Sequence, residues 1–129
     1  MKFKYTILYV EDVGQTLGFY ERAFDCKIAM HHDSGDFGAL DTGATTLAFS
    51  SVRLMQDLGK NPSRPQAGSP CFEIAFETEQ VELALDRAVS AGATLIQAVR
   101  DEPWGQTTAY VTDINGFLVE ICSPLRPQS

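Results

Sequence analysis

The chain has 129 residues, of which 44% are hydrophobic and 21% are charged, and this balance is typical of one globular domain with its own core. It excludes a disordered or fibrous chain. The formal net charge of −7 at pH 7 argues against nucleic acid and anionic membranes as partners, because clustered Lys and Arg hold such partners.

The first predicted element is a strand over residues 3–10, where FKYTILYV alternates and is rich in β-forming residues. A helix follows directly, since Asp12 with Gln15 three residues later is typical of a capping box. Apolar side chains then recur at helical spacing, namely Val13, Leu17, Tyr20 and Phe24. We expect this apolar face to pack on a sheet.

Three more strands are predicted near residues 27–32, 37–41 and 45–50. Turn-forming residues at 33–36 and 42–44 separate them, which completes a β-α-β-β-β order. Residues 52–69 hold the richest cluster of Gly and Pro, so we place a linker there, with a short helical turn around Leu54 and Leu58.

The same order begins again at Cys71, with a strand CFEIAFE and a helix from about Glu79 to Ala91 that Gly92 stops. Three further strands follow. An offset of 68 residues pairs apolar positions of the two halves, namely Val81 with Val13, Leu85 with Leu17 and Phe76 with Leu8. We expect Val81, Leu85 and Ala88 to face inward.

The predicted fold class is therefore α+β, with two tandem βαβββ modules in a single domain over residues 1–129. Module one covers about 1–51, the linker about 52–69, and module two about 70–124.

Strand alternation sorts the side chains of the second module onto two faces. Bulky residues are expected under the helix, namely Phe72, Ile74, Phe76, Phe117, Val119 and Ile121. Glu73, Glu77, Glu120 and Cys122 then lie on the other face, and the repeat adds Tyr5 to it. This face carries carboxylates among aromatic side chains.

Cys26, Cys71 and Cys122 form no CxxC motif, and their odd number fits a reducing compartment. We interpret all three as small buried apolar residues. The N-terminus lacks the apolar run of a signal peptide, so we expect a cytoplasmic protein. For His31 and His32, at a predicted strand end, we expect at least one ring in solvent.

Three segments carry a family resemblance, namely YVEDVGQTLGFYERAF, EIAFETEQVELALDRAVSAGATL and PWGQTTAYVTDINGFLVEICSP. They resemble the vicinal oxygen chelate superfamily, which includes glyoxalase I, extradiol dioxygenases, and fosfomycin and bleomycin resistance proteins. The resemblance implies a concave, partly open, barrel-like mixed sheet with helices outside, and a homodimer. The superfamily hosts many activities, so the resemblance predicts the fold and not the reaction.

Metal-dependent members of that superfamily use four inward side chains, and the resemblance maps these positions to Tyr5, Ala48, Glu73 and Glu120. Glu120 alone matches the usual ligand type, because alanine has no donor and a neutral tyrosine is a poor ligand. We therefore expect no metal and no cofactor. Two carboxylates with waters, aided by a histidine, remain an alternative site for Mg or Mn.

The leading hypothesis is a metal-independent protein that binds and sequesters a cationic or aromatic small molecule, as the PWG segment resembles that of bleomycin-binding members. Carboxylates and aromatic faces both attract cations. The expected ligand-binding residues are Tyr5, Tyr9, Ala48, Glu73, Trp104, Thr108, Tyr110 and Glu120.

The alternative hypothesis is an enzyme, in which Glu73 and Glu120 act as general base and acid or bind a metal. It would be a lyase, isomerase or dioxygenase-like enzyme acting on a small carbonyl substrate. A third hypothesis is a dimeric scaffold whose binding face has lost its role.

Overall fold

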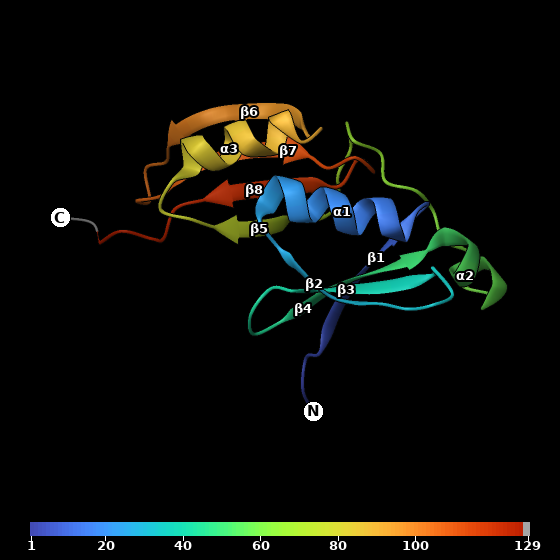
Figure 1. Ribbon diagram of the computed structural model, residues 1–129. Coiled ribbons are helices and arrows are strands. Elements are labelled where there is room, and N and C mark those ends of the chain that lie inside the picture. The colour runs from blue at the N-terminus through green and yellow to red at the C-terminus, as the bar shows by residue number, and fades with distance from the viewer. Residues whose placement is uncertain (128–129) are drawn as a thin grey trace. The chain divides into compact units, whose positions relative to one another are not determined.

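The computed structural model describes residues 1–127, and no helix in this part of the chain is long and apolar enough to cross a membrane. The chain divides into two compact units, Met1–Arg64 and a second one that starts at Pro65. Each unit contains one four-stranded sheet with a helix packed on it (Figure 1).

The first unit has the order strand, helix and three strands, followed by a short helix. The elements are β1 Tyr5–Val10, α1 Val13–Phe24, β2 Lys27–His31, β3 Phe37–Asp41, β4 Thr46–Ser51 and α2 Val52–Asp57. The strand order in the sheet is β1-β4-β3-β2, with β1 parallel to β4 and the other pairs antiparallel.

The second unit repeats this topology. Its elements are β5 Ile74–Glu77, α3 Val81–Ser90, β6 Thr94–Asp101, β7 Thr107–Thr112 and β8 Leu118–Cys122. The strand order is β5-β8-β7-β6, again with the first strand parallel to the last. The predicted fold class, α+β with two tandem βαβββ modules, is confirmed.

The strand register relates individual positions of the two modules. Ile7 pairs with Ala48 in the first sheet, and Ala75 pairs with Glu120 in the second. Because the offset of 68 residues also relates Ile7 to Ala75, Glu120 is the structural counterpart of Ala48. A carboxylate in one module thus stands where the other has a methyl group.

Helix α1 begins as the sequence predicts. The Asp12 carboxylate accepts a hydrogen bond from the backbone N–H of Gln15 at 2.9 Å, which satisfies one free donor of the first turn. Val13, Leu17 and Tyr20 are buried, as expected for the apolar face. Gly38 in β3 allows this packing, since a Cβ there would lie 2.6 Å from Cδ1 of Leu17.

Helix α3 packs on the second sheet through Val81, Leu85 and Ala88, which are buried as predicted. The helix is shorter than the predicted range and ends before Gly92, whose φ of 118° is unfavourable for other residues. Phe117, Val119 and Ile121 form the buried side of this sheet as expected, with Ile74 and Phe76 half-buried. Phe72 precedes β5 and is 46% exposed, with its ring against that of Phe117.

The expectation for the cysteines was wrong at one position. Cys26 and Cys122 are buried, but Cys71 is exposed, because it precedes β5 and is not part of the sheet. All three thiols are free.

Both His31 and His32 are exposed, in agreement with the expectation of at least one ring in solvent.

Candidate functional site

Helix α3 covers one face of the second sheet, and we call the opposite one the helix-free face. Glu120 in β8 lies between Ala75 in β5 and Tyr110 in β7, and Gln97 in β6 pairs with Tyr110 on its other side. The face is defined by these and neighbouring side chains, namely Glu73, Ala75, Glu77, Gln97, Arg100, Thr108, Tyr110, Glu120 and Cys122.

The centre of the helix-free face is a tyrosine between two carboxylates. The Tyr110 hydroxyl lies 2.7 Å from Oε2 of Glu120 and 3.2 Å from Oε2 of Glu73. A hydroxyl has one hydrogen, so Tyr110 donates to one carboxylate at a time, and the shorter distance favours Glu120. The structure thus brings together three of the side chains that the sequence singled out.

The surroundings keep the Tyr110 hydroxyl protonated. Burial is the main cause that raises the pKa of Tyr110 above its usual range, and the hydrogen bond to the Glu120 carboxylate adds to it. Burial, and then the charge of Glu120, also raise the pKa of the Cys122 thiol. At neutral pH, Tyr110 is therefore a hydrogen-bond donor, and Cys122 is no nucleophile.

A second polar network lies next to this group on the helix-free face. Oε1 of Glu102 accepts from Nε of Arg100 at 2.6 Å and from the Thr108 hydroxyl at 3.0 Å. Nε2 of Gln97 donates to the same Thr108 oxygen at 3.3 Å. The hydrogen bond from Arg100, and then that from Thr108, lower the pKa of Glu102, which is therefore a carboxylate at neutral pH.

Sequence reasoning missed Glu102, Arg100 and Gln97. Glu102 directly follows β6 and precedes Pro103, so its place in the sequence is typical of a solvent-exposed turn residue. Only the pairing of β6 with β7, which is interrupted by irregularities on both sides of Gln97, brings these three side chains to Thr108. Nothing in the alternation pattern predicts such irregularities.

Trp104 stands at the tip of the β6–β7 hairpin and is 51% exposed. Its indole N–H donates to Oε1 of Gln106 at 2.8 Å, and Nε2 of Gln106 donates to the Ser123 carbonyl at 3.0 Å. The indole is therefore braced by its own hairpin and by the end of β8. Within residues 1–127, the hydrogen bonds of Trp104 and those of Tyr110 involve different partners.

The predicted residues Tyr5, Tyr9 and Ala48 belong to the first module. Phe49 packs its ring against Tyr20 of α1, so Ala48, the preceding residue in β4, lies on the other face of that sheet. Ala48 is buried, Tyr9 is half-buried, and Tyr5 is 45% exposed with the Lys4 ammonium 5.7 Å from its ring centroid. That these three side chains share a hollow with Glu73 and Glu120 stays a prediction.

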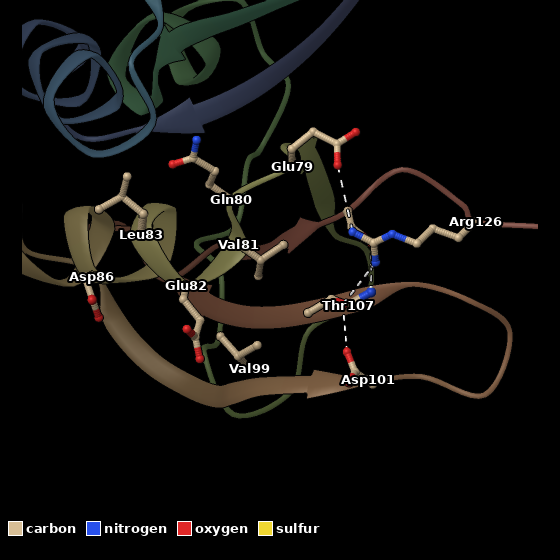
Figure 2. Close-up of a pocket in the computed structure, with 11 residues that line it drawn as sticks. Glu79, Gln80, Val81, Glu82, Leu83, Asp86, Val99, Asp101, Thr107 and Arg126 are labelled. Atoms are coloured by element: carbon tan, nitrogen blue, oxygen red, sulfur yellow. Dashed lines mark hydrogen bonds and ion pairs between the residues drawn. The ribbon is translucent and has the colours of Figure 1, made fainter.

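A groove of about 660 Å³ lies beside the start of α3 (Figure 2). Figure 2 shows Arg126 between Glu79 and Thr107, with an Nη of Arg126 3.8 Å from the Glu79 carboxylate, while the Thr107 hydroxyl donates to Asp101 at 2.7 Å. None of the predicted site residues lines this groove. Four carboxylates line it, Glu79, Glu82, Asp86 and Asp101, of which Glu79 and Asp101 have protein partners, and we assign no function to it.

The donor set does not fit the metal centre of the metal-dependent superfamily members. Ala48 offers only a methyl group, and Tyr110 engages the carboxylates of Glu73 and Glu120. Within residues 1–127, no three His, Cys, Asp or Glu side chains are grouped closely enough to hold a metal ion.

Comparisons with known proteins agree with this fold. A family model described as a glyoxalase-like domain matches residues 3–126. Two uncharacterised proteins, of Mycobacterium bovis and Mycobacterium tuberculosis, are each 28% identical to the chain over 124 residues. These alignments cover 92% of this chain and 81% and 72% of the two relatives, respectively.

Solved structures of similar fold cover almost the whole chain. A glyoxalase/bleomycin resistance protein/dioxygenase family enzyme from Burkholderia phytofirmans PsJN has a TM-score of 0.85 at 21% identity, over 97% of this chain and 100% of that one. A glyoxalase-related enzyme from Fulvimarina pelagi has a TM-score of 0.81 at 22% identity, over 95% and 88%. Such identities show a shared fold and do not show the chemistry of this chain.

Proposed function

The chain belongs to the glyoxalase-like domain family of the vicinal oxygen chelate superfamily, and from this premise we propose that it is a metal-independent small-molecule binding protein. It binds and sequesters a cationic or aromatic ligand on the helix-free face of the second module. The observation that carries this proposal is the Tyr110 hydroxyl between the carboxylates of Glu73 and Glu120.

The chemistry of this group favours a cation. Carboxylates attract it directly, and the face of an aromatic ring such as that of Tyr110 adds about 0.5–2 kcal/mol per contact. The net charge of −7 raises the local concentration of cations around the whole protein. An anionic ligand without a positive group would be repelled.

Metal independence is supported by the donor set. Of the four positions that hold the ion in metal-dependent superfamily members, Ala48 has no ligating atom, and Tyr5 has a phenol in place of the usual imidazole or carboxylate. Glu73 and Glu120 are the two remaining donors, and both lie within hydrogen-bond distance of Tyr110.

The proposal predicts that an organic cation raises the melting temperature of the wild type through Glu120. With phenyltrimethylammonium as the probe, a concentration of about 100 times the dissociation constant stabilises the fold by about 2.7 kcal/mol. Glu120→Gln should abolish most of the shift, because the amide has no charge. Glu82→Gln, which removes an exposed carboxylate from α3, is the matched control and should preserve it.

The result that contradicts the proposal is an equal shift in the wild type and Glu120→Gln, or no shift with any member of a broad panel of cationic and aromatic molecules. A shift with divalent metal ions that disappears in Glu120→Gln would instead support the metalloenzyme hypothesis.

A carboxylate-based enzyme is the second candidate, because one hydroxyl hydrogen lies within reach of two carboxylates, as proton transfer requires. Glu73, as a carboxylate, would remove a proton next to the carbonyl of a small substrate, and Glu120, in its acid form, would give its own proton to the substrate. The Tyr110 hydroxyl would then accept the proton from Glu73 and pass its own to Glu120, which restores the starting state. Exchange of that carbon-bound hydrogen for deuterium in heavy water, lost in Glu73→Gln and Glu120→Gln, would distinguish this enzyme from a binding protein.

We also propose a homodimer located in the cytoplasm. The dimer is supported by the family resemblance and by the exposed apolar side chains of the edge strand β6, Leu95 and Ile96. The location is supported by three free cysteines, an odd number that fits a reducing compartment.

A further inference from the structure

The charges on the helix-free face are unevenly distributed over its strands. Glu73 and Glu77 lie at the two ends of the β5 edge, and Glu120 lies in β8 beside it, whereas β6 at the opposite edge carries Arg100. Strand β7 separates β8 from β6, so their backbones are about 10 Å apart at the usual strand spacing. The face therefore has a negative half and, at the opposite edge, an arginine that is paired with the Glu102 carboxylate.

Arg100 is held in place by neighbours on this face. Thr108 is its cross-strand partner and is buried, and both side chains donate to Oε1 of Glu102, at 2.6 Å from Arg100 and 3.0 Å from Thr108. The Glu102 side chain is 6% exposed and that of Arg100 is 62% exposed. A sequestered carboxylate thus anchors a guanidinium that reaches the solvent.

The guanidinium of Arg100 retains donors for a ligand. Arginine has five N–H donors, and Glu102 engages Nε. Within residues 1–127, Glu102 is the carboxylate that pairs with Arg100, so both Nη groups can donate to an anion from outside. A guanidinium binds a carboxylate well, since it can offer two parallel hydrogen bonds.

We propose that the ligand of the helix-free face is a zwitterion, with its cationic end at Glu73 and Glu120 and a carboxylate on Arg100. This inference rests on the proposed function and narrows the ligand class to molecules that carry opposite charges at their two ends and are long enough to span the two strand spacings from β8 to β6, about 10 Å between backbones. Tyr110 and Gln97 follow Glu120 in one row across the sheet, and Arg100 lies in the neighbouring row, opposite Thr108. A ring and an amide therefore lie beside the space between the two charged ends.

The test uses three matched probes, namely octylamine, octanoate and aminooctanoate with its amine at the far end of the chain. Their affinities are measured by titration calorimetry with the wild type and with Arg100→Gln. Aminooctanoate should bind the wild type about tenfold more tightly than octylamine does, which corresponds to about 1.4 kcal/mol. Arg100→Gln should remove this advantage without weakening the binding of octylamine, because the variant makes the face more negative.

Arg53→Gln is the matched control, because Arg53 is also an exposed arginine paired with a carboxylate, that of Asp36 at 2.8 Å. It should preserve the tenfold advantage. Arg100→Lys keeps the charge but loses the paired donors, so an intermediate affinity for aminooctanoate is expected.

The outcomes separate the two proposals. Equal affinities for aminooctanoate and octylamine in the wild type, both dependent on Glu120, would overturn the zwitterion and leave the cation site intact. An Arg100→Gln variant that also loses octylamine would overturn the specific role of Arg100. If no probe bound in a Glu120-dependent manner, the proposed function itself would fail.

Discussion

The hydroxyl of Tyr110 has one hydrogen and two carboxylate neighbours, so its loss should affect the fold as well as the ligand. Hydrogen bonds to charged groups contribute about 1.5–3 kcal/mol when buried, and the partly exposed position of Tyr110 reduces this value. Without the hydroxyl, Glu73 and Glu120 face each other with no donor between them.

Tyr110→Phe should therefore lower the free energy of unfolding by roughly 1–2 kcal/mol at neutral pH, as measured by urea unfolding. Because folding raises the pKa of Tyr110, the unfolded chain releases this proton first as the pH rises above the ordinary value of 10.0. The wild type then loses stability that the variant never had, so the difference between them should shrink. A difference that stays constant into alkaline pH would contradict this account.

At the residue scale, the sequence predicted part of the candidate site. Alternation was sufficient to place Glu73 and Glu120 on one face, since side chains in regular strands point to alternate sides. Glu102 and Arg100 could not be predicted, because their positions depend on irregular pairing between β6 and β7. Burial of the Glu102 carboxylate depends on its neighbours Arg100 and Thr108, which no local pattern reveals.

At the scale of elements, the close contact between α1 and β3 depends on Gly38. A Cβ at this position would lie 2.6 Å from Leu17 Cδ1, 3.1 Å from Val13 Cγ1 and 3.2 Å from the carbonyl oxygen of Met30. Such overlap forces the helix or the side chains to move. Glycine is thus required here by packing and not by its backbone angles.

Gly38→Ala should lower the free energy of unfolding by about 1–3 kcal/mol in urea titrations, because the core has no space for the methyl group. Gly68→Ala is the matched control, since a Cβ at residue 68 would meet nothing within 4 Å, and it should change stability by less than about 0.5 kcal/mol. Similar effects of the two substitutions would show that α1 can shift at little cost.

The elements themselves were predictable where apolar spacing and capping agreed. The Asp12 cap and the apolar face of α1 are found as predicted. Helix α3 begins at Val81 and not at Glu79 as predicted, and its N-cap residue Gln80 makes no side-chain capping hydrogen bond. The predicted turn around Leu54 became the helix α2, capped by Ser51, whose hydroxyl accepts from the N–H of Leu54 at 3.0 Å. Ser51 lies between the predicted strand at 45–50 and the predicted linker at 52–69, so its role as a helix cap was not predicted.

At the scale of the whole molecule, the two modules share a topology and differ in chemistry. Glu120 and Tyr110 are adjacent across β8 and β7, while the matching row of the first sheet has Ala48 and Ala39. The repeat therefore preserves the strand order and not the side chains that could bind a ligand. A repeat offset predicts the fold of such a chain, but it does not predict which module carries the chemistry.

The proposed homodimer is tested by the mass in solution. Edge strands such as β6 expose unpaired backbone groups together with Leu95 and Ile96, and a second copy could cover them. Sedimentation at micromolar concentration should give a particle of twice the chain mass of 14.2 kDa. A mass of 14.2 kDa would contradict the dimer.

The unequal exposure of the three cysteines makes the natural chain suitable for site-selective labelling. Burial, followed by the charge of Asp25, raises the pKa of the Cys26 thiol to about 11, and Cys122 is likewise held as a thiol. Cys71 is exposed and stands two residues before Glu73. A maleimide dye would therefore attach there first, and its emission would report occupancy of the neighbouring carboxylates without any engineered handle.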